Sequence, residues 1–138
     1  MKYTVKSIDE TQALAKKFAT ELKNGDIVCL NGDLGAGKTT FTQFVFSALG
    51  VKEPVTSPTF SILKMYQGEK FKLNHFDTYR ITDEEAIEAG FDEILEDKDG
   101  ISFIEWGENI DPLIPKKHID VNIKIINDRT REIEIKYE

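Results

Sequence analysis

The sequence predicts an α/β fold, a single domain in which helices flank a mixed, mostly parallel central sheet that carries antiparallel hairpins. Strand-like apolar runs alternate with amphipathic helical stripes along the chain, as they do where helices cover a parallel sheet. Alternating segments at residues 60–77 and 119–137 flank short polar turns, which favours antiparallel hairpins there. The 138 residues contain no repeat, linker or low-complexity tract, so we expect one domain spanning residues 1–138.

The N-terminal elements are a short strand and a helix. Residues 3–5 have a strand-like pattern, and Ser7 and Glu10 have the spacing of a capping box that opens a helix. The helix is expected to end near Asn24 and Gly25. Its apolar stripe consists of Thr11, Leu14, Ala15, Phe18 and Leu22.

A buried strand and a second helix follow, joined by a glycine-rich segment. Residues 27–30 are apolar and partly β-branched, as in a strand buried on both faces. The helix after the segment is expected to stop at Gly50, and its stripe consists of Phe41, Phe44, Val45, Ala48 and Leu49. Pro54 and Pro58 indicate an irregular stretch over residues 51–59.

The second half of the chain is predicted to hold mainly strands and one short helix. Thr82 and Glu85 form a second capping box, which opens a helix that stops at Gly90. The remaining strands are expected at residues 60–66, 71–77, 101–104, 119–126 and 131–137.

The glycine-rich segment is a complete phosphate-binding loop, with the pattern Gly, four residues, Gly-Lys-Thr. A strand before it and a helix after it direct backbone N–H groups and the helix N-terminus at phosphate. Lys38 is expected to reach the outer phosphates, and the Thr39 hydroxyl to ligate Mg²⁺. The sequence therefore predicts a P-loop NTPase that binds a nucleoside triphosphate through Gly32, Asp33, Leu34, Gly35, Ala36, Gly37, Lys38, Thr39 and Thr40.

Two acidic residues at strand ends are candidates for the metal and for catalysis. Glu105 ends the more apolar strand, and we expect it to serve the metal. Asp77 ends a strand with one exposed face and is expected to act near the γ-phosphate. The alternative for each is a carboxylate paired with a neighbour, such as Arg80 for Asp77.

Thr56 lies in the irregular stretch after the loop helix, where nucleotide switches place a threonine that senses the γ-phosphate and Mg²⁺. We include it among the catalytic candidates, although a polar turn would have a similar sequence. Guanine-specific proteins usually carry an Asn-Lys-x-Asp string, which this sequence lacks, so adenine is the expected base.

Composition and residue usage exclude several other classes of function. A net charge of −7 disfavours unaided binding of nucleic acid, and acidic residues gather at 83–97 as a solvated face or a docking surface for a basic partner. The sequence has no apolar run of membrane-spanning length and no secretion signal at its start, so we expect a cytoplasmic protein.

Cys29 and Trp106 are interpreted as packing residues. His75 and His118 have no cysteine or histidine at metal-binding spacing, which disfavours a zinc site.

Taken together, these motifs resemble the TsaE (YjeE) family of small bacterial P-loop ATPases. The resemblance runs from about Ser7 to Arg131. It rests on the loop at 32–40, Ser-Pro-Thr-Phe at 57–60, His-Phe-Asp-Thr-Tyr-Arg at 75–80 and Glu-Trp at 105–106, in that order and spacing.

The resemblance implies that ATP and Mg²⁺ bind at residues 34–39, with Thr39 and Glu105 at the metal. It also implies that Ile8 lies near the base and that an arginine of the last hairpin approaches the nucleotide. Arg131 is the better match for that arginine, and Arg129 is the alternative.

The resemblance further implies a role in threonylcarbamoyladenosine synthesis on tRNA. The chain would hydrolyse ATP for the TsaB–TsaD complex, meet tRNA only through that complex, and turn over slowly without it. A small-molecule P-loop kinase is a weaker alternative, because such kinases use several arginines and this chain has three. A nucleotide-dependent adaptor without hydrolysis is a second alternative, against which the acids Asp77 and Glu105 argue.

Overall fold

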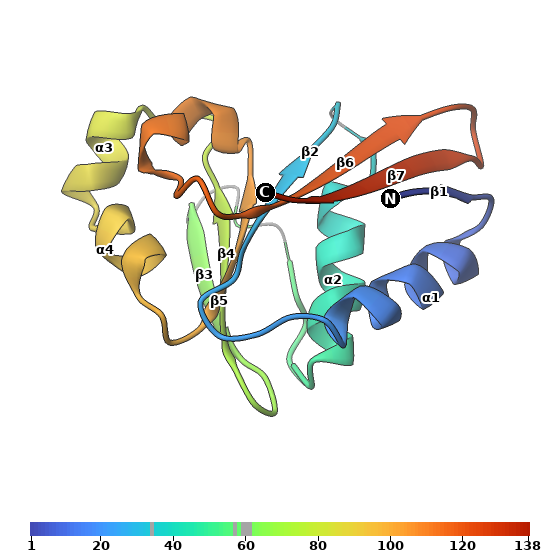
Figure 1. Cartoon of the computed structure of the whole chain (residues 1–138), viewed down its shortest axis with the longest axis horizontal. Helices are drawn as coiled ribbons and strands as arrows, with labels where there is room; N and C mark the ends of the chain where they lie inside the picture. The colour runs from blue at the N-terminus through green and yellow to red at the C-terminus, as the bar shows by residue number, and fades with distance from the viewer. Residues whose placement is uncertain (34, 57, 59–61) are drawn as a thin grey trace.

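Seven strands form one mixed sheet in the order β1-β7-β6-β2-β5-β4-β3 in the computed structural model of the chain (Figure 1). The structure describes residues 1–33, 35–56, 58 and 62–138. The strands are Lys2–Val5 (β1), Ile27–Asn31 (β2), Leu63–Gln67 (β3), Lys72–Asp77 (β4), Ile101–Glu105 (β5), Ile119–Ile125 (β6) and Arg131–Tyr137 (β7).

The sheet has a parallel centre and antiparallel edges. Strands β6, β2, β5 and β4 pair in parallel, whereas β1, β7 and β3 each pair antiparallel to their neighbours. Because β1 is antiparallel to β7 and β7 to β6, β1 has the direction of the central strands, and five of the seven strands run the same way. The prediction of a mixed, mostly parallel sheet with hairpins is therefore confirmed.

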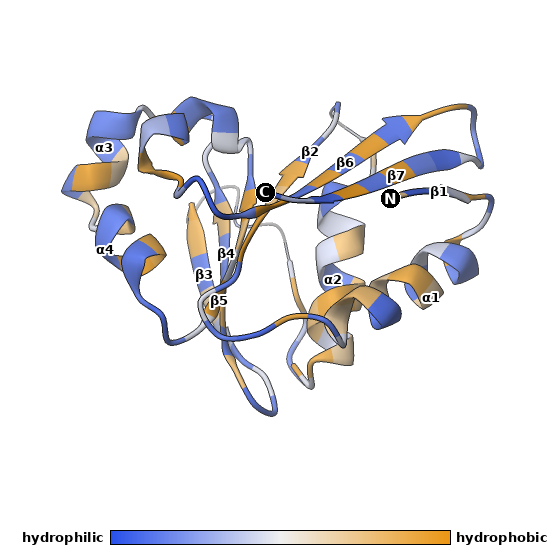
Figure 2. Cartoon of the chain, in the orientation of Figure 1, coloured by the Kyte–Doolittle hydropathy of each residue, from blue (hydrophilic) through white to orange (hydrophobic). Residues whose placement is uncertain are grey.

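Helices cover the two faces of the sheet. Helices α1 (Ile8–Ala19) and α2 (Lys38–Ala48) pack on one face over a core that includes Phe18, Phe41, Phe46 and Phe103. Helices α3 (Asp83–Glu88) and α4 (Phe91–Glu96), with the 3₁₀ segment η1 (Gly107–Leu113), cover a smaller core on the other face. Figure 2 shows hydrophobic central strands between outer segments with many hydrophilic residues. Within the described ranges, no helix has the length and apolar character to cross a membrane.

Most predicted elements are found, with differences in length. Ser7 caps α1 by accepting a hydrogen bond from the Glu10 backbone N–H at 3.1 Å. The helix ends at Ala19, earlier than predicted, because a turn continues the apolar stripe and buries Leu22. The Thr82 capping box opens α3 as expected. The predicted strand at 60–66 is observed from Leu63, and its first two residues lie outside the described ranges.

Two elements, α4 and η1, are absent from the sequence-based prediction. Helix α4 has only six residues and no side-chain cap, since left-handed Gly90 precedes it. Segment η1 contains Pro112 and a non-helical residue, Ile110, so it carries no regular apolar stripe. Phe91, Ile94 and Leu95 of α4 do have helical spacing, but six residues are too short a window for periodicity to separate a helix from a turn, and η1 has no regular spacing.

Parallel pairing sets the position of the functional residues. Leu30 of β2 lies opposite Glu105 of β5, and Asp77 of β4 lies opposite Glu105 on the other side. The ends of β2, β5 and β4 therefore meet at one edge of the sheet. Open α/β sheets bind ligands at this carboxyl edge.

Candidate functional site

The phosphate-binding loop connects β2 to α2 and leaves the start of α2 open. Gly37 precedes the helix with a φ of 105°, in the left-handed region, and no side chain caps the helix among the described residues. A Cβ on Gly32 would lie 2.5 Å from the Ile123 carbonyl oxygen, so the chain approaches β6 too closely for a side chain. Uncapped N–H groups at a helix N-terminus are a binding site for phosphate. Leu34, predicted to belong to this loop, lies outside the described residues.

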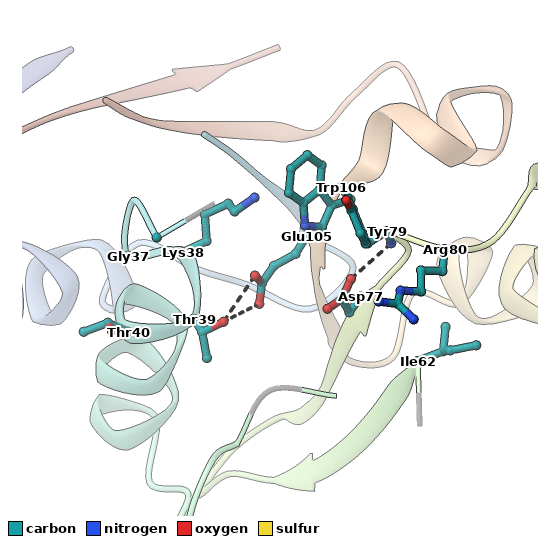
Figure 3. A pocket seen from close by; sticks show the side chains of 11 residues that line it. Gly37, Lys38, Thr39, Thr40, Ile62, Asp77, Tyr79, Arg80, Glu105 and Trp106 are labelled. Carbon is teal, nitrogen blue, oxygen red and sulfur yellow. Dashed lines mark hydrogen bonds between the residues drawn. The ribbon is translucent and has the colours of Figure 1, made fainter. Parts of the chain in front are cut away.

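A cavity of about 570 Å³ opens beside this helix start (Figure 3). Its lining comes from the loop and α2, from the end of β4 with the turn after it, and from the end of β5. Lys38, Thr39, Asp77 and Glu105 all line it, so four of the predicted catalytic and metal-binding residues share one cavity.

Glu105 lies at the centre of a chain of polar contacts. Only 4% of this residue is exposed, and its carboxylate accepts from the Thr39 hydroxyl, with oxygen–oxygen distances of 3.0 and 3.2 Å. His75 Nε2 lies 2.7 Å from the same carboxylate, and an Nε2–H would donate to it. Hydroxyl and carboxylate oxygens are ligands that Mg²⁺ takes, so the donor set fits the predicted metal site.

His75 is a site residue whose role the sequence analysis missed. It is fully buried on β4, and its Nδ1 atom has no hydrogen-bond partner in the described part of the chain. His75 precedes Asp77 by two residues on β4, and this spacing puts both side chains on one face of the strand. The spacing is the feature of the sequence that could have identified His75 as a site residue. A buried carboxylate requires such a partner, because an unpaired buried charge is costly.

Lys38 contacts Trp106, the second residue whose role the sequence analysis missed. The Lys38 ammonium donates to the Gly32 carbonyl at 2.9 Å and lies 3.7 Å from the centre of the Trp106 ring. Trp106 also packs on Tyr79, with ring centres 4.8 Å apart. The indole therefore lines the cavity and holds Lys38 by a cation–π contact, beyond the packing role expected for it.

The backbone at Trp106 is strained and held by Thr78. Trp106 has a φ of 63°, which is uncommon for a bulky residue. The buried Thr78 hydroxyl lies 3.0 Å from the Glu105 carbonyl and 2.6 Å from the Trp106 carbonyl. Asn109 donates in turn to the Thr78 carbonyl at 2.9 Å. These bonds fix the orientation of Glu105 and Trp106.

Asp77 is partly buried and faces the cavity. Its Oδ1 accepts from the Tyr79 backbone N–H at 3.1 Å (Figure 3). Arg80 lines the same cavity, but within the described ranges it forms no salt bridge with Asp77. The carboxylate therefore remains available to solvent or a ligand.

A second cavity of about 460 Å³ lies on the other side of the loop and shares Gly35, Gly37 and Thr40 with the first. Ile8, Arg129 and Arg131 line it, so the residues expected near a nucleotide share one cavity beside the loop. Nη1 of Arg131 donates to the Asn127 carbonyl at 2.7 Å. Both arginines face this cavity, so the choice between them stays open.

Thr56 is not brought to either cavity. It is exposed, its hydroxyl accepts from Lys64, and its backbone N–H donates to the Tyr66 hydroxyl at 3.3 Å. Its predicted catalytic role is not supported by this position and stays a prediction. Ser57 and Thr59 of the same segment lie outside the described residues.

Comparisons with known proteins agree with the sequence motifs. Residues 5–133 match the family model described as threonylcarbamoyl adenosine biosynthesis protein TsaE. A Rickettsia typhi protein named tRNA threonylcarbamoyladenosine biosynthesis protein TsaE is 43% identical, with 99% of this chain and 94% of that protein covered. A Bacillus subtilis protein of the same name is 40% identical, with coverages of 96% and 83%. The crystal structure of Bacillus subtilis YdiB superposes with a TM-score of 0.85 at 36% identity and covers 99% of this chain and 84% of that one.

Replacing Thr78 by valine tests whether its hydroxyl holds the strained backbone. We expect Thr78→Val to lower the free energy of unfolding by about 1–3 kcal/mol, because a buried carbonyl loses its donor. The emission of Trp106, the only tryptophan, should shift in the folded variant. Urea unfolding and fluorescence measure the two effects. Thr20→Val removes an exposed hydroxyl–carbonyl bond and should change stability by less than about 0.5 kcal/mol. Equal, small effects of both variants would contradict this role of Thr78.

Proposed function

The chain belongs to the TsaE family of tRNA threonylcarbamoyladenosine biosynthesis proteins, and from this premise we propose that it is a Mg²⁺-dependent ATPase of that pathway. The observation that carries the proposal is the contact between the first threonine of the loop helix and a buried strand-end carboxylate, Thr39 to Glu105 at 3.0 Å. In P-loop NTPases this pair of groups holds the metal between the nucleotide phosphates.

The loop residues would bind the triphosphate. The uncapped start of α2 offers N–H groups to the phosphates, and Lys38 adds a positive charge beside them. In the structure this charge is satisfied by Gly32 and Trp106. Phosphate oxygens are stronger partners for an ammonium group than a carbonyl or an aromatic ring. Lys38 therefore would exchange its present contacts for the nucleotide.

Glu105 and Asp77 would divide the remaining chemistry. Bound Mg²⁺ would supply charge neutralisation at the β- and γ-phosphates, and Thr39 with Glu105 would hold it. His75 would orient the Glu105 carboxylate through the contact at Nε2. Asp77 Oδ2 has no hydrogen-bond partner within the described residues, and the carboxylate would orient the attacking water or accept its proton.

The second cavity would accept the nucleoside. Ile8 is 63% exposed at its rim and offers an apolar contact for a base. Arg129 and Arg131 would approach the sugar or the phosphates from the last hairpin. The absence of a guanine-recognition string in the sequence supports adenine.

The TsaB–TsaD complex is the proposed partner, with tRNA reached only through it. This chain's net charge of −7 disfavours direct contact with RNA. The exposed carboxylates of α3 and α4 form an acidic surface that includes Glu84, Glu85, Glu88, Glu93 and Glu96. Hydrolysis would then reset the complex between rounds of modification.

Lys38→Ala tests the phosphate-binding role. We expect ATP turnover by the variant, with Mg²⁺ and with TsaB–TsaD present, to fall by about 10²–10³-fold because charge stabilisation is lost. Phosphate release measures turnover, and Lys52→Ala, an exposed lysine after the loop helix, is the matched control. Equal turnover by Lys38→Ala and wild type would contradict the ATPase assignment.

Separate effects are expected for the two acids. Glu105→Gln should raise the Mg²⁺ concentration that gives half-maximal turnover, because a metal-holding charge is removed. Asp77→Asn should lower the maximal rate by about 10²–10⁴-fold while ATP still binds. Turnover measured against Mg²⁺ concentration separates the two parameters. If Asp77→Asn shifted the Mg²⁺ dependence and Glu105→Gln did not, the assigned roles would be exchanged.

The partner proposal predicts stimulation of turnover. Adding TsaB–TsaD should raise the rate of the isolated chain, because nucleotide hydrolases that lack a spare cation gain about 10³–10⁵-fold when a partner supplies one. Glu84→Lys with Glu85→Lys should reduce this response without changing the basal rate. An isolated chain that already turns over at the maximal rate would contradict partner control.

A further inference from the structure

Three potential metal ligands meet on the sheet face opposite α1 and α2. One ligand atom from each of Cys29, His118 and Asp120 lies within 4.8 Å of the other two. Cys29 belongs to β2 and Asp120 to β6, and parallel pairing puts them directly opposite each other. His118 precedes β6. Sequence spacing gave no support for a zinc site, but strands far apart in the chain bring these three potential ligands together.

Neighbouring groups orient these ligands as they are oriented in metal sites. His118 Nδ1 lies 2.8 Å from the Pro115 carbonyl, to which an Nδ1–H would donate, and Nε2 would exchange its present contact with Asp120 for the ion. His118 Nε2 points at Asp120 Oδ2, 3.1 Å away. The other oxygen of Asp120 accepts from the Asn31 side chain at 3.2 Å. His118 and Asp120 therefore each have a second hydrogen bond, to Pro115 and to Asn31, that would hold the side chain in place around an ion.

The spacing is close to that of a tetrahedral site. Zinc–ligand bonds of about 2.0–2.3 Å put ligand atoms roughly 3.3–3.8 Å apart. The three ligand atoms lie within 4.8 Å of one another, so a pair at that separation would have to approach by roughly 1–1.5 Å to reach the tetrahedral spacing. The His118 and Asp120 side chains are 20% and 22% exposed, so an ion can enter from solvent on their side, whereas Cys29 closes the inner side.

We propose that Cys29, His118 and Asp120 bind a thiophilic divalent cation, of which Zn²⁺ is the best candidate. A solvent molecule would be the fourth ligand. Thiolate, imidazole and carboxylate together suit zinc and disfavour Mg²⁺, which prefers oxygen ligands. On binding, the Cys29 thiol forms the sulfur–metal bond and its proton leaves to solvent. The ion would join β2, β6 and the segment before β6.

The charges around Cys29 also favour a cation. Burial, and to a smaller extent the carboxylates of Asp120, Asp111 and Glu108, raises the pKa of the Cys29 thiol to about 12, which opposes the loss of its proton, so the sulfur–metal bond has to offset this cost. The same carboxylates attract a divalent ion to the thiol. Asp111 and Glu108 belong to η1, which follows Trp106 directly, so an ion here would stabilise the segment that supports the phosphate site.

Cobalt titration of the full chain tests this site. Co²⁺ takes the place of Zn²⁺ and gives a near-ultraviolet sulfur-to-cobalt charge-transfer band when a thiolate binds it. We expect one equivalent of Co²⁺ to produce this band in wild type and added Zn²⁺ to remove it. Cys29→Ser and His118→Ala should lose the band, whereas Asp111→Asn, which changes a nearby charge but no ligand, should keep it.

A second readout covers variants that fold poorly. Zn²⁺ should raise the melting temperature of the wild type in the absence of ATP and Mg²⁺, and an added chelator should reverse the rise. The absence of a charge-transfer band in folded wild type would overturn the proposal. A band that persists in Cys29→Ser would also overturn it, since the sulfur would then come from elsewhere. A negative result in these experiments would leave the ATPase proposal untouched, because the metal-site proposal and the ATPase proposal rest on different residues.

Discussion

The structure depends on a buried carboxylate, Glu105, and on the groups that make its burial tolerable. A charge with 4% exposure is expensive unless it is paired, and here Thr39 and His75 both contact it. These partners come from the loop helix and from β4, so the carboxylate joins three elements at one edge of the sheet. The parallel register of β2, β5 and β4 makes the arrangement possible. Removing one partner would leave the others with an uncompensated charge.

Beside this carboxylate, the chain stores backbone strain where a ligand would act. Trp106 adopts a left-handed conformation, and two carbonyl contacts from Thr78 keep it there. The result is an indole ring under the Lys38 ammonium, in the cavity proposed for the phosphates. Strain of this kind persists only where the surrounding contacts over-determine it, and it is commonly found at functional sites. Lys38 is therefore held between the Gly32 carbonyl and the Trp106 ring.

Much of the fold and part of the site could be predicted from the sequence, because they depend on local patterns. The loop motif, the apolar strand before it and the strand-end acids are all readable from neighbouring residues, as are the capping boxes at Ser7 and Thr82. Helix α4 was not predicted because six residues are too few for a periodic signal, and segment η1 was not predicted because it has no regular apolar stripe. The roles of His75, Trp106 and the Cys29–His118–Asp120 cluster escaped for another reason. They depend on strand register and on side-chain direction across segments far apart in the chain, which one sequence does not reveal.

If the chain binds ATP as proposed, the outer phosphates draw Lys38 away from Trp106. Fluorescence of Trp106, the only tryptophan, reports this contact directly during titration with ATP and Mg²⁺. The account predicts a saturable change in emission with ATP and little change with AMP, which lacks the outer phosphates. An emission spectrum that stays constant while calorimetry records ATP binding would contradict it, because the nucleotide would then bind without reaching Lys38.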